Sequence, residues 1–104
     1  MPTFKKTDEF DAWHKRLDKS PRIAIVERIL HAESGILGKP MKGTGGICEI
    51  VMDTGPGYRL YYCRETSAIY WLLMGGIKKD QTQDLKRAQS LRAELERSGY
   101  GKAD

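Results

Sequence analysis

The sequence predicts an α+β domain in which a small antiparallel sheet carries a helical hairpin from the N-terminal third and a helix from the C-terminal end. Apolar residues recur at helical spacing over roughly residues 8–34 and 80–97, whereas β-branched and aromatic residues fill three short runs between them. The length of 104 residues suits one domain with one core, so we expect a single domain over 1–104.

The N-terminal third is expected to form a strand and two helices. Residues 2–6 are a candidate edge strand, and Thr7 is a cap for a first helix whose apolar face holds Phe10, Trp13 and Leu17. Ser20 and Pro21 form a cap and first-turn pair for a second helix with an apolar stripe of Ile23, Val26, Ile29 and Leu30. The short link predicts an antiparallel hairpin.

The middle of the chain is expected to form strands. After a possible short strand at 39–42, the runs 47–52, 58–64 and 69–74 are separated by turn residues. Connections this short join antiparallel neighbours, so these three strands form a meander.

A last helix is expected from about Asp80 to Arg97. Asp80 is a good cap and Gln83 stands at the capping-box position. One stripe of this helix should pack on the sheet, and it holds Leu85, Ala88, Leu91 and Leu95.

The pairing of 47–52 with 58–64 decides what shares a face with Arg59. If the residue numbers of paired positions add up to an odd number, both faces mix apolar and polar side chains, and Cys48 lies opposite Cys63. If they add up to an even number, one face is apolar, and the other carries Glu49, Val51, Arg59, Tyr61 and Cys63. Burying an unpaired arginine costs several kcal/mol, so we expect the even register, no disulfide, and Arg59 and Tyr61 on an open face away from the hairpin.

Composition narrows the function classes. The net charge of +4 suits a polyanion or an acidic protein partner. The longest uncharged run, 66–77, is too short to span a bilayer, and the N-terminus has no signal-peptide pattern, so we expect a cytoplasmic protein without a membrane partner. The cysteines and histidines lack metal-ligand spacing, so we expect no metal and no cofactor. His14 and His31 are interpreted as structural or solvent-exposed.

The remaining candidates for chemistry are Arg59, Tyr61, Lys78 and Lys79. Such a set can cleave RNA without metal or histidine: the ribose 2′-OH attacks the adjacent phosphate, the cations stabilise the developing charge, and a lysine or tyrosine moves protons. The alternative is that these side chains are ordinary surface groups.

Motifs along the chain favour the first interpretation. Three runs, taken in order, resemble the RelE/ParE superfamily of toxins. They are Gly57 to Tyr62, Leu72 to Gln81 with two glycines, a lysine and a glutamine, and Asp84-Leu85. The resemblance is greatest to the HigB-like group, the addiction-module killer proteins. Two positions depart from that group, which often has an arginine in place of Val51 and a polar residue in place of Ile77.

The resemblance implies a RelE-like fold and the toxin of a type II toxin–antitoxin system. It implies a metal-independent endoribonuclease that cuts messenger RNA on the ribosome and is neutralised by an antitoxin, usually a helix-turn-helix protein. By position Arg59 would stabilise the phosphate, with Lys78 beside it; Tyr61 and Lys79 are further catalytic candidates, and Lys42 and Gln81 are candidate RNA-binding residues.

Two alternatives stay open for the activity: a ParE-like inhibitor that binds DNA gyrase without catalysis, and a catalytically inactive basic binding module. Two also stay open for the antitoxin. It either covers the cations Arg59, Lys78 and Lys79 and so competes with RNA, or it binds the helical hairpin and blocks entry to the ribosome by bulk.

Overall fold

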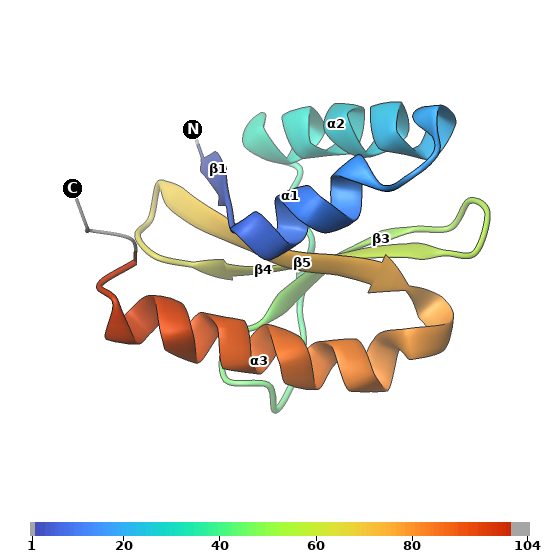
Figure 1. Cartoon of the computed structure of the whole chain (residues 1–104). Helices are drawn as coiled ribbons and strands as arrows, with labels where there is room; N and C mark the ends of the chain where they lie inside the picture. Colours follow the sequence, from blue (N-terminus) through green and yellow to red (C-terminus); the bar gives the residue numbers. More distant parts are fainter. Residues whose placement is uncertain (1, 101–104) are drawn as a thin grey trace.

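The computed structural model describes residues 2–100 as three layers: a helical hairpin, a sheet and a C-terminal helix. Figure 1 shows the hairpin of α1 and α2 above the sheet and α3 below it. The predicted fold class and hairpin are therefore confirmed. Among residues 2–100, no helix combines the length and the apolar character needed to cross a membrane.

The sheet has five strands in the order β1-β5-β4-β3-β2. The three long strands form the predicted antiparallel meander, but β1 pairs with β5 in parallel, so the sheet is mixed rather than antiparallel. The strands are β1 (Thr3–Lys6), β2 (Lys39–Pro40), β3 (Cys48–Met52), β4 (Tyr58–Arg64) and β5 (Ile69–Ile77). No turn connects β1 to β5, and local sequence signals therefore do not set their relative direction.

The first helix, α1 (Asp8–Lys15), begins as predicted. The Thr7 hydroxyl accepts a hydrogen bond from the Phe10 backbone N–H at 3.0 Å and donates one to the Leu73 carbonyl at 2.7 Å. One side chain therefore caps the helix and ties its start to β5.

The second helix, α2 (Lys19–Glu33), starts one residue earlier than the predicted cap at Ser20, with Asp18 in the N-cap position. Ser20 and Pro21 both lie in its first turn, where the missing N–H of proline leaves no bond unmade. The predicted stripe is largely wrong. Ile29 is buried, but Ile23, Val26 and Leu30 are exposed, and the core positions are Ile25, Ile29 and Ala32.

The last helix, α3 (Gln81–Arg97), follows a short 3₁₀ turn, η1 (Lys78–Asp80). Asp80 occupies the N-cap position, but its side chain makes no capping hydrogen bond, so the predicted capping box is not formed. The predicted stripe is confirmed, because Ala88 and Leu91 are buried and Leu85 and Leu95 pack around them.

The even register is confirmed, with Cys48 opposite Tyr62 and Val51 opposite Arg59. It gives the sheet two different faces. The hairpin face is lined by Phe4, Phe10, Ile25, Ile29, Ile50, Leu60, Tyr62 and Leu72, and the α3 face by Ile47, Tyr61, Cys63, Leu73, Met74, Ala88 and Leu91. Both cysteines are free, as predicted: Cys63 belongs to the α3-face cluster and Cys48 packs against the hairpin-face one.

Candidate functional site

Arg59 and Tyr61 lie side by side on the α3 face of β4. Their predicted face is confirmed, since the hairpin packs on the other side. The prediction that this face is open is wrong: α3 packs across β4 and β5, leaving Arg59 7% exposed and Tyr61 0% exposed.

Three polar atoms of these two side chains are buried without a hydrogen-bond partner in the described part of the chain. Nε and Nη1 of Arg59 and the hydroxyl of Tyr61 make no hydrogen bond with any described residue. The nearest carboxylate to the guanidinium belongs to Asp53, whose oxygen lies 3.9 Å from Nη1 and whose side chain is 91% exposed. A pair at that distance, with its acid exposed, recovers little of the free energy lost when the guanidinium is desolvated. The fold therefore holds an arginine with unused N–H donors in a low-dielectric setting.

Acidic and amide side chains lie on the same face near Tyr61. The Gln81 side-chain amide donates to a Glu49 carboxylate oxygen at 3.0 Å, which links the start of α3 to β3 beside Tyr61. Asp84, one turn after Gln81, lies over Gly76, the β5 residue in register with Arg59. The carboxylate of Asp84 occupies the volume that a Cβ at Gly76 would fill, so a larger residue there would have to displace the end of the Asp84 side chain.

Sequence reasoning did not select Asp84 and Glu49 as site residues, although two signals pointed to them. Glu49 has the same parity as Tyr61 in the even register. Asp84 stands at i+3 from Gln81 and so shares its helix face.

Burial raises the pKa of Tyr61 to about 12, and the negative charges of Asp84 and Glu49 add to this effect. The phenol is therefore protonated at neutral pH and can donate a hydrogen bond or a proton, but it is a poor base. Burial, and then the charge of Asp80, also raises the pKa of the Asp84 carboxyl above its ordinary value.

The predicted lysines divide into two groups. Lys78 is exposed in η1, its backbone N–H donates to the Gly57 carbonyl at 2.7 Å, and its side-chain stem lies against Gly57, two residues before Arg59. Lys79 is exposed beside it. Lys42 is also exposed, but its loop contacts α3 at Gln89, about 12 Å along the helix from Gln81 at the usual rise per residue. Arg59, Tyr61, Gln81 and Lys78 thus gather at one place, and Lys42 lies outside it.

The histidines fit the interpretation made from the sequence. His14 stacks on Phe10 with ring centroids 5.9 Å apart, and its Nε2 lies 2.9 Å from the Arg22 carbonyl, whereas His31 is exposed. Within residues 2–100, no cluster of three or more His, Cys, Asp or Glu side chains is arranged to hold a metal ion.

Comparison with known proteins gives a family and a fold. An uncharacterized protein of Haemophilus influenzae is 35% identical over 92 residues, which covers 88% of this chain and 93% of that protein. This chain belongs to the same family. No protein-family profile matches it.

Among solved structures, the chain is similar to a double variant of the E. coli toxin RelE in its free state. The TM-score is 0.68 with 13% sequence identity, and the alignment covers 86% of this chain and 94% of that one. The predicted RelE-like fold is therefore confirmed.

Proposed function

We propose that this protein is the toxin of a toxin–antitoxin pair and cleaves messenger RNA on the ribosome as a HigB-like endoribonuclease. One observation carries the proposal: in a RelE-like fold, Arg59 is buried with two nitrogen atoms that make no hydrogen bond with a described residue. A guanidinium kept in this state at a cost in stability is suited to bind a phosphate.

The proposed reaction needs no redox step or co-reactant. The ribose 2′-oxygen forms a bond to the adjacent phosphorus, and the bond from phosphorus to the 5′-oxygen breaks, which leaves a 2′,3′-cyclic phosphate and a 5′-hydroxyl. One proton leaves the 2′-OH and one reaches the 5′-oxygen. Arg59 and Lys78 stabilise the charge that develops on the phosphate oxygens. Tyr61 is suited to donate a proton, because its raised pKa keeps it protonated.

Access to Arg59 is part of the proposal. The guanidinium is almost closed off, and its edge near Asp53 faces an acid that is itself exposed. A phosphate oxygen that replaces the Asp53 carboxylate would gain a charged donor already stripped of water. Lys79 and Gln81 flank the start of α3 and are proposed to hold RNA there, while Lys42 is a candidate only for contacts further along α3.

The proposed partners follow from the proposed class. They are a cognate antitoxin, expected to be a helix-turn-helix protein, and the ribosome with its messenger RNA, and the proposed location is the cytoplasm. The reaction as proposed uses neither a metal nor a cofactor.

The test is inducible expression of the wild type and of Arg59→Ala, with Arg64→Ala as the matched control on the same strand. Arg64 is exposed at the far end of β4. We expect growth arrest and cleavage of translated messenger RNA from the wild type and Arg64→Ala. Arg59→Ala should cleave about 10²–10³-fold more slowly, the usual cost of losing one charge stabiliser, and should remain folded by circular dichroism. Full toxicity of Arg59→Ala, or arrest with intact RNA and gyrase-dependent DNA breaks, would contradict the proposal.

A further inference from the structure

The outward side of α2 carries a stripe of exposed apolar side chains. Ile23, Val26 and Leu30 are 48%, 45% and 58% exposed. Their spacing of three and four residues puts them on one line along the helix. Single exposed aliphatic residues are ordinary, but a line of three on one helix face is typical of an interface.

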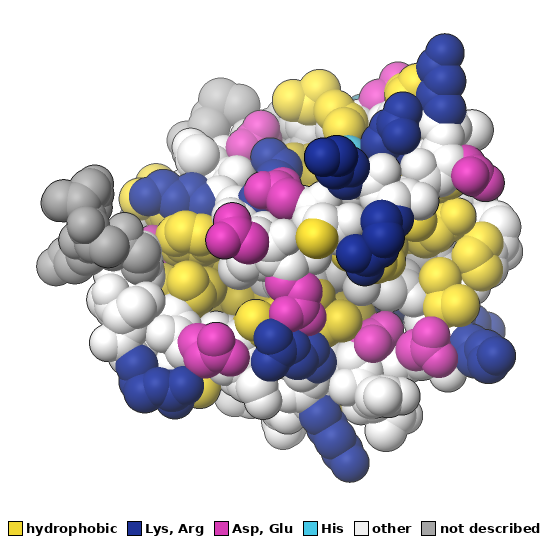
Figure 2. All heavy atoms as spheres, in the orientation of Figure 1, with side chains coloured by type: hydrophobic (Ala, Val, Ile, Leu, Met, Phe, Trp, Pro, Cys, Tyr) yellow, Lys and Arg dark blue, Asp and Glu magenta, His cyan; other side chains and the backbone are white. Residues whose placement is uncertain are grey.

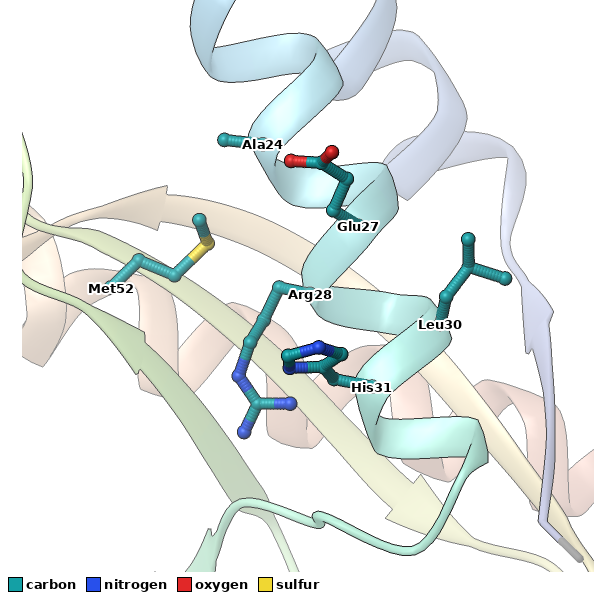
Figure 3. Close-up of a pocket in the computed structure, with 6 residues that line it drawn as sticks. All are labelled: Ala24, Glu27, Arg28, Leu30, His31 and Met52. Atoms are coloured by element: carbon teal, nitrogen blue, oxygen red, sulfur yellow. The ribbon is translucent and has the colours of Figure 1, made fainter.

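A groove adjoins this apolar stripe. It has a volume of about 530 Å³ and lies between α2 and Met52 of β3. Figure 3 shows Arg28 and His31 projecting from α2 on one side of the groove and Met52 reaching toward them from the other. The Arg28 guanidinium donates to the Ile36 carbonyl at 2.9 Å and has no carboxylate partner within residues 2–100.

Unpaired cations border the stripe at the turn between α1 and α2. Residues 15–28 contain five Lys or Arg against Asp18 and Glu27, a net charge of +3 out of the chain's +4. The five are Lys15, Arg16, Lys19, Arg22 and Arg28, and none forms an ion pair with a described residue. We call these five residues the cationic rim. Figure 2 shows yellow and dark-blue side chains, with some magenta ones among them, along the upper edge of the molecule, over α1 and α2.

The surface of α3 differs, although its sequence is also basic. Arg87 pairs with Glu9 at 2.6 Å and with Glu94 at 3.6 Å, and Arg92 pairs with Glu96 at 3.4 Å. Two of the four cations of α3 are therefore neutralised within the molecule. None of the five cations of the rim forms an ion pair with a described residue, although acidic residues elsewhere on α1 and α2 balance their charge over the hairpin as a whole.

We propose that the apolar stripe and cationic rim of α2 bind an acidic amphipathic helix of a partner protein. Apolar residues of that helix would pack on Ile23, Val26 and Leu30, and its carboxylates would meet the cationic rim. The proposal rests on the proposed function for the partner's identity, which is the antitoxin. The partner would then bind the layer opposite Arg59 and neutralise by bulk rather than by covering the site.

The chemistry of the surface favours this occupant over two others. A second copy would bring the same excess positive charge to the cationic rim. RNA would be drawn to the rim but would leave the aliphatic stripe in water. An acidic amphipathic helix satisfies both the charge and the apolar stripe.

The test is binding between the intact chain and the product of each gene flanking its own, co-expressed and purified. Relative to the wild type, Leu30→Glu in the apolar stripe should weaken binding by about 30-fold or more. Lys19→Glu in the cationic rim should weaken it by less. The matched controls Ser90→Glu and Lys86→Glu, exposed on α3, should bind like the wild type. Lys79→Glu should also keep its affinity, whereas a partner that covers the site would lose affinity for this variant.

Three results would overturn the proposal. The first is a complex that survives Leu30→Glu, and the second is a wild type that binds neither gene product. The third is a wild type that forms no protein complex but binds phosphatidylglycerol vesicles, when Leu30→Glu does not bind them. Leu30→Glu expressed alone should still arrest growth, since it lies outside the candidate site. The Arg59→Ala experiment therefore judges the proposed function separately.

Discussion

The two faces of the sheet bury different kinds of side chain. On the hairpin face, Phe4, Phe10 and Tyr62 pack against aliphatic side chains, and the core cluster holds no charged residue. On the α3 face, the buried layer includes Arg59 and the hydroxyl of Tyr61, and three of their polar atoms make no hydrogen bond within residues 2–100. The difference indicates that the hairpin face supplies stability, whereas the α3 face loses stability by burying polar groups without partners among the described residues. Under the proposed function, these are the groups that act on RNA.

The largest effect on stability is expected from Trp13→Ala. The Trp13 ring packs 5.7 Å from Phe10, centroid to centroid, and lies against Gly75 on the hairpin face. Losing a large packed aromatic costs about 3–5 kcal/mol, so urea denaturation should show a loss of that size. Lys15→Ala, exposed on the same helix, should change the free energy of unfolding by less than about 0.5 kcal/mol. An unchanged midpoint for Trp13→Ala would refute the assignment of the hairpin face as the main stabilising layer.

Two adjacent glycines allow the faces to be compared within one strand. A Cβ at Gly75 would collide with the Trp13 ring, and one at Gly76 with the Asp84 carboxylate. A packed ring yields less than the end of a side chain, so Gly75→Ala should cost about 2–3 kcal/mol and Gly76→Ala about 1 kcal/mol, within the usual range for overpacking. Gly76→Ala should lower RNA cleavage more than Gly75→Ala does, when both are compared at equal folded fraction.

The double variant Gly76→Ala/Asp84→Ala controls for this explanation. It removes the carboxylate that the new methyl group would meet, so it should regain the stability lost by Gly76→Ala. A double variant that is no more stable than Gly76→Ala would show that the strain lies in the backbone and not at Asp84.

A smaller effect is expected from the Asp84 carboxyl, and it should depend on pH. Because burial raises its pKa, the folded state holds this proton more tightly than the unfolded state. The free energy of unfolding therefore falls as pH rises from about 4, the ordinary value, through the folded pKa. Asp84→Asn lacks this loss, so its stability relative to the wild type should be higher at pH 7 than at pH 3.5. A difference that is the same at both pH values would contradict the burial of Asp84.

Local signals predicted the parts of the fold that local chemistry determines. The Thr7 cap, the even register of β3 with β4 and the α3 stripe follow from side-chain spacing and capping rules. The apolar stripe of α2 was predicted wrongly, because apolar residues occupy 23–26 as well as 29 and 30, and periodicity alone does not select a face. The parallel pairing of β1 with β5 depends on contacts across the whole chain.

The residues proposed for the site were chosen from the sequence, and their environment was not predicted correctly. Arg59 was expected on an open face because burying an unpaired guanidinium is costly, and that rule holds for most of a protein. It failed at this residue, where the guanidinium is buried and two of its nitrogen atoms make no hydrogen bond with a described residue. Departures of this kind are expected at functional sites, since function there competes with stability. The contacts of Asp84 and Glu49 required the position of α3 on the sheet.

The most direct test of this exchange of stability for function is Arg59→Met, measured both by urea denaturation and by RNA cleavage in a translating extract. Methionine fills much of the same volume without orphan donors, so the free energy of unfolding should equal the wild-type value or exceed it by up to about 2 kcal/mol. Cleavage should fall by about 10²–10³-fold. A variant that is less stable than the wild type by more than about 1 kcal/mol, or one that cleaves RNA at the wild-type rate, would contradict the account.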